Sequence, residues 1–502
     1  MRARREGSYV SGSIIPWTSE YEDYLRDESR RIGTADSISF PTSEAEVIEV
    51  VKEVRAQGGT ITVQGARTGI VAGAVPQGGH VLNLSRMNRI GDVSGDFITV
   101  EPGAILDDVR EAVKGSGRFF PPDPTETTAS VGGMVACNAS GALTFHYGPT
   151  RNWVQSLRMV LSDGDLIAVR RGQCLAQGRS FSLATEGGRT IGGDLPLYSV
   201  PNVKSAAGYY VADGMDILDL LVGMEGTLGI ITEVELKLIR RPGAINGLTV
   251  FLPTEEAALK LVRILREQLP MRPVGIEFFN HDALDLLRCM RSESSAFERI
   301  PALKPDYHTA VYAEFHADAE EEIEEPIMAL MEAIVELGGS DEDTWYATND
   351  RELEPLKAFR HAVPEAVNLL IDRRKRDCPE LTKLGTDMSV PDDRLEDVIA
   401  MYGADLEGRG LESVVFGHVG NNHVHVNILP RSIEEYEKGK MLYLDWARQI
   451  VGLGGSVSAE HGIGKIKVPL LRMMYGDEAV AEMRSLRLLF DPDEVLNRGS
   501  LF

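Results

Sequence analysis

The sequence has few basic residues for its length, and this shortage excludes one class of partner. Of its 502 residues, 52 are Lys or Arg and 76 are Asp or Glu, which gives a formal net charge of −24. A surface of that sign repels phosphate backbones and anionic lipid. We therefore expect no nucleic-acid partner.

Cysteines and long apolar runs are also scarce. The four cysteines, at positions 137, 174, 289 and 378, form no Cys-x-x-Cys pair, so we expect neither an iron–sulfur cluster nor a disulfide framework. A cytoplasmic, reducing location fits this usage best. No apolar run approaches the roughly 20 residues of a membrane span, and residues 7–13 are too polar for the apolar core of a signal peptide.

What the chain does contain is enough apolar material for several domains. Hydrophobic residues make up 43% of the sequence, and at about 100–200 residues per domain we expect two to four domains. A breaker cluster at residues 240–243 separates a glycine-dense first half from a second half whose pattern predicts two β-α-β units on one sheet. The sequence therefore predicts an α+β protein.

Three glycine-rich segments stand in the first half. The first follows a helix with a Ser43-x-x-Glu46 capping box and a short β-branched strand, and carries Gly65, Gly69 and Gly73. Its amides are able to hold a pyrophosphate, although an ordinary turn explains the same residues. The second segment combines Pro-Pro-Asp-Pro at 121–124 with small residues up to 141, and the third spaces three glycines before a strand at 230.

The second half carries a cluster of histidines. In residues 423–428 the alternation of a strand places His423, His425 and Asn427 on one face, and a hairpin returns His418 to their side. Glu460 and His461 stand later in a glycine-flanked segment. This set favours a metal site or catalysis, while histidines that only form structural hydrogen bonds remain the alternative.

These motifs, in this order from about residue 36 to the C-terminus, resemble the flavin-dependent D-2-hydroxyacid dehydrogenase group of the vanillyl-alcohol oxidase superfamily. The resemblance implies an N-terminal arm (1–35), a two-subdomain FAD-binding domain of the PCMH type (36–242), a ferredoxin-like α+β cap domain for the substrate (243–449) and a C-terminal segment that returns to the FAD domain (450–502).

The resemblance also implies FAD as the cofactor. Some members of the superfamily tether flavin through a loop histidine, and residues 64–75 contain none, so we expect FAD to bind non-covalently. The residues implied to bind it are Gly65, Ala66, Arg67, Thr68, Gly69, Gly73, Pro122, Asp123, Ser130, Gly132, Gly133, Asn138, Gly141, Ile230 and Asn497.

In the second half, the resemblance assigns a divalent metal to His418, His425 and Glu460, and the catalytic base to His461. Zinc, iron and manganese all suit mixed His/carboxylate ligation. The family more often has Asn where this chain has His423, which is able to serve as an added ligand or to orient the substrate. Arg360 and Lys383 match its basic positions and are expected to hold a substrate carboxylate.

The implied reaction is oxidation of a D-2-hydroxyacid, of the D-lactate, glycolate or D-2-hydroxyglutarate class, to the 2-oxoacid with hydride transfer to FAD. Electrons must then leave to an external acceptor: electron-transfer flavoprotein, a quinone or a cytochrome. Three alternatives stay open, namely a flavin transferase like alkylglycerone-phosphate synthase, a non-flavin metal-dependent hydrolase and a binding module whose metal is structural. The sequence is compatible with a homo-oligomer but does not specify one.

Overall fold

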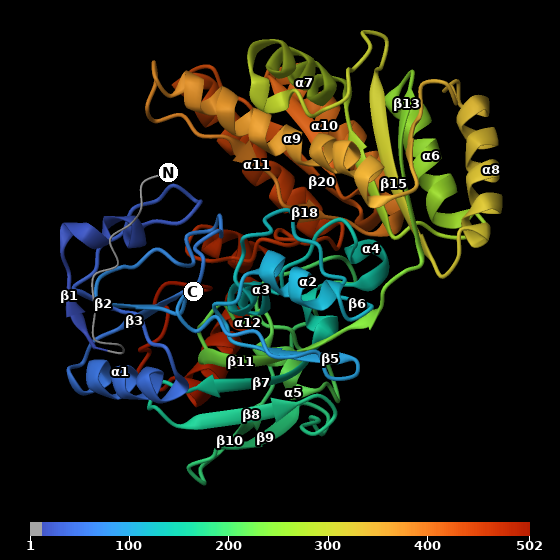
Figure 1. Ribbon diagram of the computed structural model, residues 1–502. Coiled ribbons are helices and arrows are strands. Elements are labelled where there is room, and N and C mark those ends of the chain that lie inside the picture. Colours follow the sequence, from blue (N-terminus) through green and yellow to red (C-terminus); the bar gives the residue numbers. More distant parts are fainter. Residues whose placement is uncertain (1–12) are drawn as a thin grey trace.

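The computed structural model describes residues 13–502 and arranges them as a body with a second domain on top (Figure 1). The body contains residues 13–240 together with the C-terminal segment, and the upper domain runs from β13 to α11. Within the described residues, no helix combines the length and the apolar character that would be needed to span a bilayer.

The first part of the body is a four-stranded sheet covered by one helix. Helix α1 begins after Ser43, whose side chain accepts a hydrogen bond from the Glu46 amide, as the capping box predicts. Its valines pack on the sheet in one core cluster. The strands lie in the order β1-β2-β4-β3, and the elements are β1 (Ile15–Pro16), β2 (Ser37–Ser39), α1 (Glu44–Ala56), β3 (Ile61–Gln64) and β4 (His80–Asn83).

The second part of the body is an antiparallel sheet of order β5-β11-β7-β8 with short helices and two small ribbons beside it. Its elements are β5 (Phe97–Val100), α2 (Leu106–Lys114), β6 (Arg118–Phe119), α3 (Val131–Cys137), α4 (Thr144–Tyr147), β7 (Val154–Val160), β8 (Leu166–Arg170), β9 (Ser180–Ala184), β10 (Thr190–Asp194), α5 (Ile217–Leu221), β11 (Ile230–Lys237) and β12 (Ile239–Arg240).

The upper domain is built on an eight-stranded sheet whose first four strands have ferredoxin-like topology. The chain order β13-α6-β14-α7-β15-α8-β16 places these strands as β16-β13-β15-β14, so each β-α-β unit is split by a strand of the other. The elements are β13 (Ala244–Leu252), α6 (Glu255–Glu267), β14 (Gly275–Phe279), α7 (His281–Glu293), β15 (Thr309–Ala317), α8 (Glu321–Glu336) and β16 (Trp345–Ala347).

Strands β19 and β20 extend this sheet and bring the histidines with them. The remaining elements of the domain are α9 (Asp350–Arg374), β17 (Leu384–Gly385), β18 (Met388–Ser389), α10 (Leu395–Arg409), β19 (Ser413–Gly417), β20 (His423–Ile428) and α11 (Ile433–Gly452).

The two faces of the upper sheet differ in chemistry. Residues Val424, Val426 and Ile428 belong to the large core that includes α6, α8, α10 and α11. The opposite face packs on α7 and α9 through a separate core cluster. Because side chains alternate along a strand, His423, His425 and Asn427 lie on the other face from those valines, as the sequence predicts.

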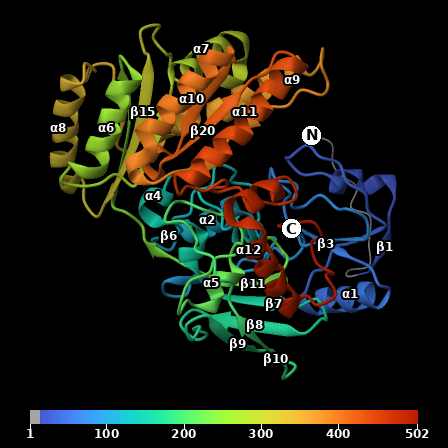
Figure 2. The same ribbon diagram turned by 180° about the vertical axis from the view of Figure 1, so that it is seen from behind.

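The C-terminal segment returns to the body. The boundary expected between residues 449 and 450 falls inside α11. Helix α12 (Val468–Phe490) then runs between the two parts of the body, as Figures 1 and 2 show from opposite sides. Beyond it, Leu496 pairs with Ile61 at the start of β3, so the end of the chain extends the first sheet.

Candidate active site

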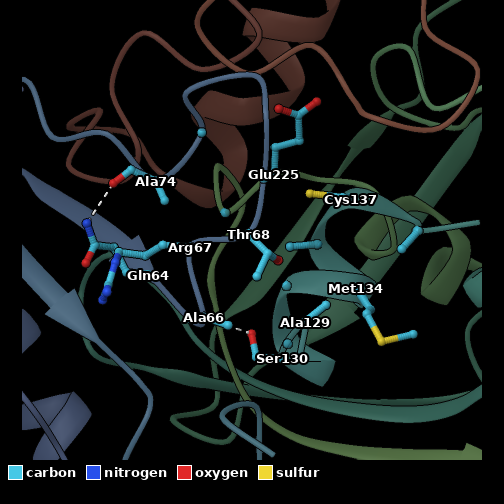
Figure 3. Close-up of a pocket in the computed structure, with 18 of the residues that line it drawn as sticks. Gln64, Ala66, Arg67, Thr68, Ala74, Ala129, Ser130, Met134, Cys137 and Glu225 are labelled. Atoms are coloured by element: carbon cyan, nitrogen blue, oxygen red, sulfur yellow. Dashed lines mark hydrogen bonds between the residues drawn. The ribbon is translucent and has the colours of Figure 1, made fainter. Parts of the chain in front are cut away.

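The loop after β3 forms one wall of a cavity of about 310 Å³ (Figure 3). Gln64 donates a hydrogen bond to the Ala74 carbonyl at 2.7 Å and so closes the loop on itself. The Ala66 amide donates to Ser130 Oγ, and a Cβ at Gly65 would lie 2.1 Å from the same oxygen. Only glycine permits this approach.

Two other glycines of the loop face open space instead. A Cβ at Gly69 or Gly73 would meet no atom within 4 Å, although both residues line the cavity. The loop is therefore packed on one side and free on the other, which suits a dinucleotide whose phosphates approach the backbone. The residues present fit the FAD that the sequence implies.

Most of the predicted cofactor residues line this cavity, and a few lie behind its walls. Those on the wall are Gly65, Ala66, Arg67, Thr68, Gly69, Gly73, Ser130, Gly132, Gly133 and Asn497. Among the others, Pro122 and Asp123 accept hydrogen bonds from Arg110, Gly141 packs on the Asp123 carbonyl, and Asn138 caps α3.

Ile230 lies in the core beside α1, and its neighbour Ile231 lines the cavity. This difference follows from strand alternation at the start of β11.

Glu225 is a wall residue that the sequence analysis did not single out. Its carboxylate is buried and accepts hydrogen bonds from the amides of Ile463 at 2.7 Å and Gly464 at 2.6 Å. Burial raises its pKa to about 7, against the opposing effect of these bonds. Glu225 thereby fixes the segment that follows His461. In the sequence, the position of Glu225 within the glycine motif before β11 was the feature that could have indicated it.

The histidines meet Glu460 at the edge of this cavity. The Nε2 atoms of His418 and His425 each lie 3.3 Å from a Glu460 carboxylate oxygen. His423 is fully buried next to them, and the four side chains offer donor atoms that all lie within 4.8 Å of one another. Turn η5 (Val419–Asn421) reverses the chain between the first histidine and β20, which explains the convergence.

The second ring nitrogens of these histidines point to acceptors. His418 Nδ1 lies 2.6 Å from the Glu277 carboxylate, and His425 Nδ1 lies 2.9 Å from the Thr386 carbonyl. Histidines that ligate metals have such outer partners, which fix the ring and its tautomer. The donor set of two imidazoles and a carboxylate thus fits a divalent metal ion.

The charges around Glu460 are closely balanced. Burial would raise the pKa of Glu460, but Lys204, 2.7 Å from one carboxylate oxygen, and His418 lower it well below its usual value. Burial alone would lower the pKa of His418, whereas the carboxylates of Glu277 and Glu460 raise it to about 9. Lys204 is 256 residues from Glu460 in the chain, so no local pattern indicates it.

His461 connects the histidine cluster to the cavity. It lines the cavity together with Glu460, and its Nδ1 lies 3.1 Å from Asp387. Burial would raise the pKa of Asp387, but His461 and Lys467 lower it well below its usual value. The amides of Glu460 and His461 also donate to Asp387. Asp387 therefore holds both residues of this pair in place.

Arg360 reaches the same region from α9. It is buried, 3.4 Å from Asp123 of the body and 3.9 Å from Glu314 of β15, and its guanidinium lies over the Tyr312 ring. Burial would lower its pKa, but Glu277 and Asp123 raise it further above its usual value. A permanent cation thus stands beside Glu277, the partner of His418.

Lys383 is placed differently from the other predicted residues. It precedes β17, and apart from burial the Arg30 charge is what lowers its pKa. In β17 it is Gly385 that pairs with Asn427 of the histidine strand. The structure therefore brings Arg360, His418, His423, His425, Glu460 and His461 together, and the role of Lys383 stays a prediction.

Curated relatives match nearly the whole chain. It is 28% identical to D-lactate dehydrogenase of Anaerostipes hadrus, over 96% of this chain and 92% of that one. It is 29% identical to D-2-hydroxyglutarate dehydrogenase of Xanthomonas citri pv. viticola, over 96% and 93%. It is 30% identical to the probable mitochondrial D-lactate dehydrogenase of Danio rerio, over 96% and 87%.

A solved structure and two family models agree with these relatives. An alkyldihydroxyacetonephosphate synthase has the same fold, with a TM-score of 0.61 at 17% identity over 93% of this chain and 76% of that one. A model of an FAD-binding domain matches residues 35–170, and a model of the C-terminal domain of FAD-linked oxidases matches residues 241–501. The chain therefore belongs to the family of FAD-linked oxidases.

Proposed function

We propose that this chain is an FAD-dependent dehydrogenase that oxidises a D-2-hydroxyacid, of the D-lactate, glycolate or D-2-hydroxyglutarate class, to the 2-oxoacid. One observation carries the proposal: Glu460 and His461 line the same cavity as the glycine loop of the FAD-binding domain. A substrate at the histidine cluster would then lie next to a flavin. The names of the relatives support this choice of substrate class.

Two bound groups would supply chemistry that side chains cannot. Residues 65–73 would hold a non-covalent FAD, which would supply the hydride acceptor, and His418, His425 and Glu460 would hold a divalent ion, which would supply a Lewis acid for the hydroxyl. Zinc, iron and manganese are the ions we propose for this donor set.

The protein's own groups bind the substrate and move its proton. Arg360 presents a planar, bidentate donor that suits the substrate carboxylate. Asp387 beside Nδ1 holds the His461 ring in the tautomer whose proton is on Nδ1. Nε2 is therefore unprotonated and removes the hydroxyl proton of the substrate. Lys204 forms an ion pair with Glu460. Its positive charge reduces the repulsion between the Glu460 carboxylate and an anionic substrate.

The reduced flavin needs an external electron acceptor. We propose that this acceptor is electron-transfer flavoprotein, a quinone or a cytochrome. On the basis of cysteine usage, we also propose a cytoplasmic location. A homo-oligomer is compatible with this scheme.

An anaerobic flavin-reduction assay tests the function. We expect purified protein to release FAD on denaturation and to bleach with a D-2-hydroxyacid but not with its L enantiomer. We expect chelator treatment to slow the bleaching and a divalent ion to restore it. Protein that contains no FAD and hydrolyses an ester or amide would overturn the proposal in favour of a metal-dependent hydrolase.

A further inference from the structure

We propose that His423 is a fourth protein ligand of the metal, so that the site is built from three histidines and one glutamate. This inference rests on the metal site of the proposed function and goes beyond its three ligands. His423 has no exposed surface, and among the described residues its Nδ1 has no hydrogen-bond partner, while its Nε2 lies 3.2 Å from Asp387. A buried ring nitrogen without a partner is costly, which points to a ligand that satisfies Nδ1.

The orientation of the ring indicates which nitrogen is the donor. His423 Nδ1 lies 3.9 Å from the Glu460 carboxylate, and Nε2 lies 3.2 Å from Asp387. His418 and His425 show the same arrangement, with one nitrogen toward Glu460 and the other toward a carboxylate or carbonyl. Three rings that share this orientation converge on one point, as ligands with outer-shell partners do.

A purely structural role for His423 explains less. Asp387 already accepts hydrogen bonds from four donors: the Ser458 hydroxyl, the Lys467 ammonium and the amides of Glu460 and His461. Three of these bonds fall on Oδ2, so Oδ1 keeps a lone pair for His423 Nε2 at 3.2 Å. A structural role thus accounts for Nε2 but supplies no partner for Nδ1 among the described residues. On the other side, the His423 ring centroid lies 4.4 Å from that of His425 and 5.5 Å from that of His418, inside the ligand cluster.

A fourth protein ligand restricts the identity of the ion. A 2-hydroxyacid that chelates through its hydroxyl and one carboxylate oxygen needs two coordination positions. A four-coordinate zinc ion, typical of protein sites, would have none left. Four protein donors and a bidentate substrate therefore require six positions, which favours Fe²⁺, Mn²⁺ or Co²⁺ over zinc.

The test compares Co²⁺ binding by full-length, FAD-loaded wild-type protein and by the His423→Ala and His423→Asn variants. Affinity is measured by competition with a chelator, and the visible absorption of Co²⁺ reports its coordination. We expect at least a tenfold loss of affinity and an altered spectrum in both variants. His80→Asn, which removes a buried histidine of the first sheet, is the matched control and should change neither.

The same protein gives a measurement that needs no variant. X-ray absorption of Co²⁺-loaded wild type should fit three imidazoles and not two. Unchanged affinity and spectrum in the His423 variants, or a two-imidazole fit, would overturn the inference. If the wild type still bleaches with the D-2-hydroxyacid in that case, the proposed function stands without it.

Discussion

At the scale of single residues, His461 contacts carboxylates from two different segments. Its Nδ1 lies 3.1 Å from Asp387 and its Nε2 lies 3.6 Å from Glu460. The first contact orients the ring, and the second places the other nitrogen next to the proposed metal site. We therefore expect replacement of this ring to affect proton removal more than substrate binding or folding.

We predict that His461→Asn lowers the rate of anaerobic flavin reduction by about 10²–10⁴-fold, the usual contribution of a general base. Stopped-flow absorbance with a D-2-hydroxyacid measures this rate. FAD content and melting temperature should stay near wild type, because the side chain is 29% exposed. A surface variant, His281→Asn, provides the control. An unchanged reduction rate would remove His461 from the chemistry.

Glu225 predicts a pH dependence of stability. Its pKa in the folded protein is about 7, against a usual 4.5, so the folded state binds this proton more tightly than the unfolded state. Its contribution to stability is therefore complete below pH 4.5 and is lost as the pH rises through 7.

We expect Glu225→Gln to gain melting temperature relative to wild type as the pH is raised from 5 to 8, because the variant carries no buried charge. Differential scanning calorimetry across this range measures the difference. For Glu332→Gln, an exposed control, the difference in melting temperature from wild type should stay constant over this pH range. A flat difference for Glu225→Gln as well would show that its carboxyl group titrates normally.

At the scale of elements, the loop after β3 combines tightly packed and open glycines. Gly65 touches Ser130, whereas Gly69 has nothing within 4 Å of a Cβ. We predict that Gly69→Val lowers FAD affinity at least tenfold with little change in the melting temperature of the apoprotein. Flavin fluorescence on titration measures the affinity. Gly115→Val, at the open and exposed end of α2, should bind FAD like wild type.

Local patterns in the sequence predict the elements well. The capping box at Ser43 predicts the start of α1, and the alternation of residues 423–428 predicts which side chains of β20 face the site. Both features depend only on residues a few positions apart. The glycine loop is equally local, since its conformation follows β3 directly.

Partners distant in the chain could not be predicted in this way. Lys204, Glu277 and Asp387 gain their roles only when the upper sheet, the body and the C-terminal segment meet around Glu460. Lys383 stays a prediction, because the register of β17 against β20 pairs Gly385 with Asn427 and does not itself involve Lys383.

At the scale of the whole molecule, the C-terminal segment joins the two parts of the body. Asn497 accepts a hydrogen bond from the Val63 amide at 2.7 Å and donates one to the Glu225 carbonyl at 2.8 Å. The first contact is to β3 and the second is to the glycine segment before β11. One buried side chain thus connects both sheets at the wall of the cavity.

We predict that Asn497→Gly destabilises the protein by about 1–3 kcal/mol, because two buried backbone groups lose their partner. Glycine suits the test since Asn497 has φ 39, a left-handed conformation that glycine adopts freely. Urea unfolding measures the loss, and FAD should dissociate at a lower urea concentration than from wild type. Arg498→Ala, an exposed neighbour, should stay within about 0.5 kcal/mol. If Asn497→Gly lost no more free energy of unfolding than Arg498→Ala, the two sheets would be held together by packing alone.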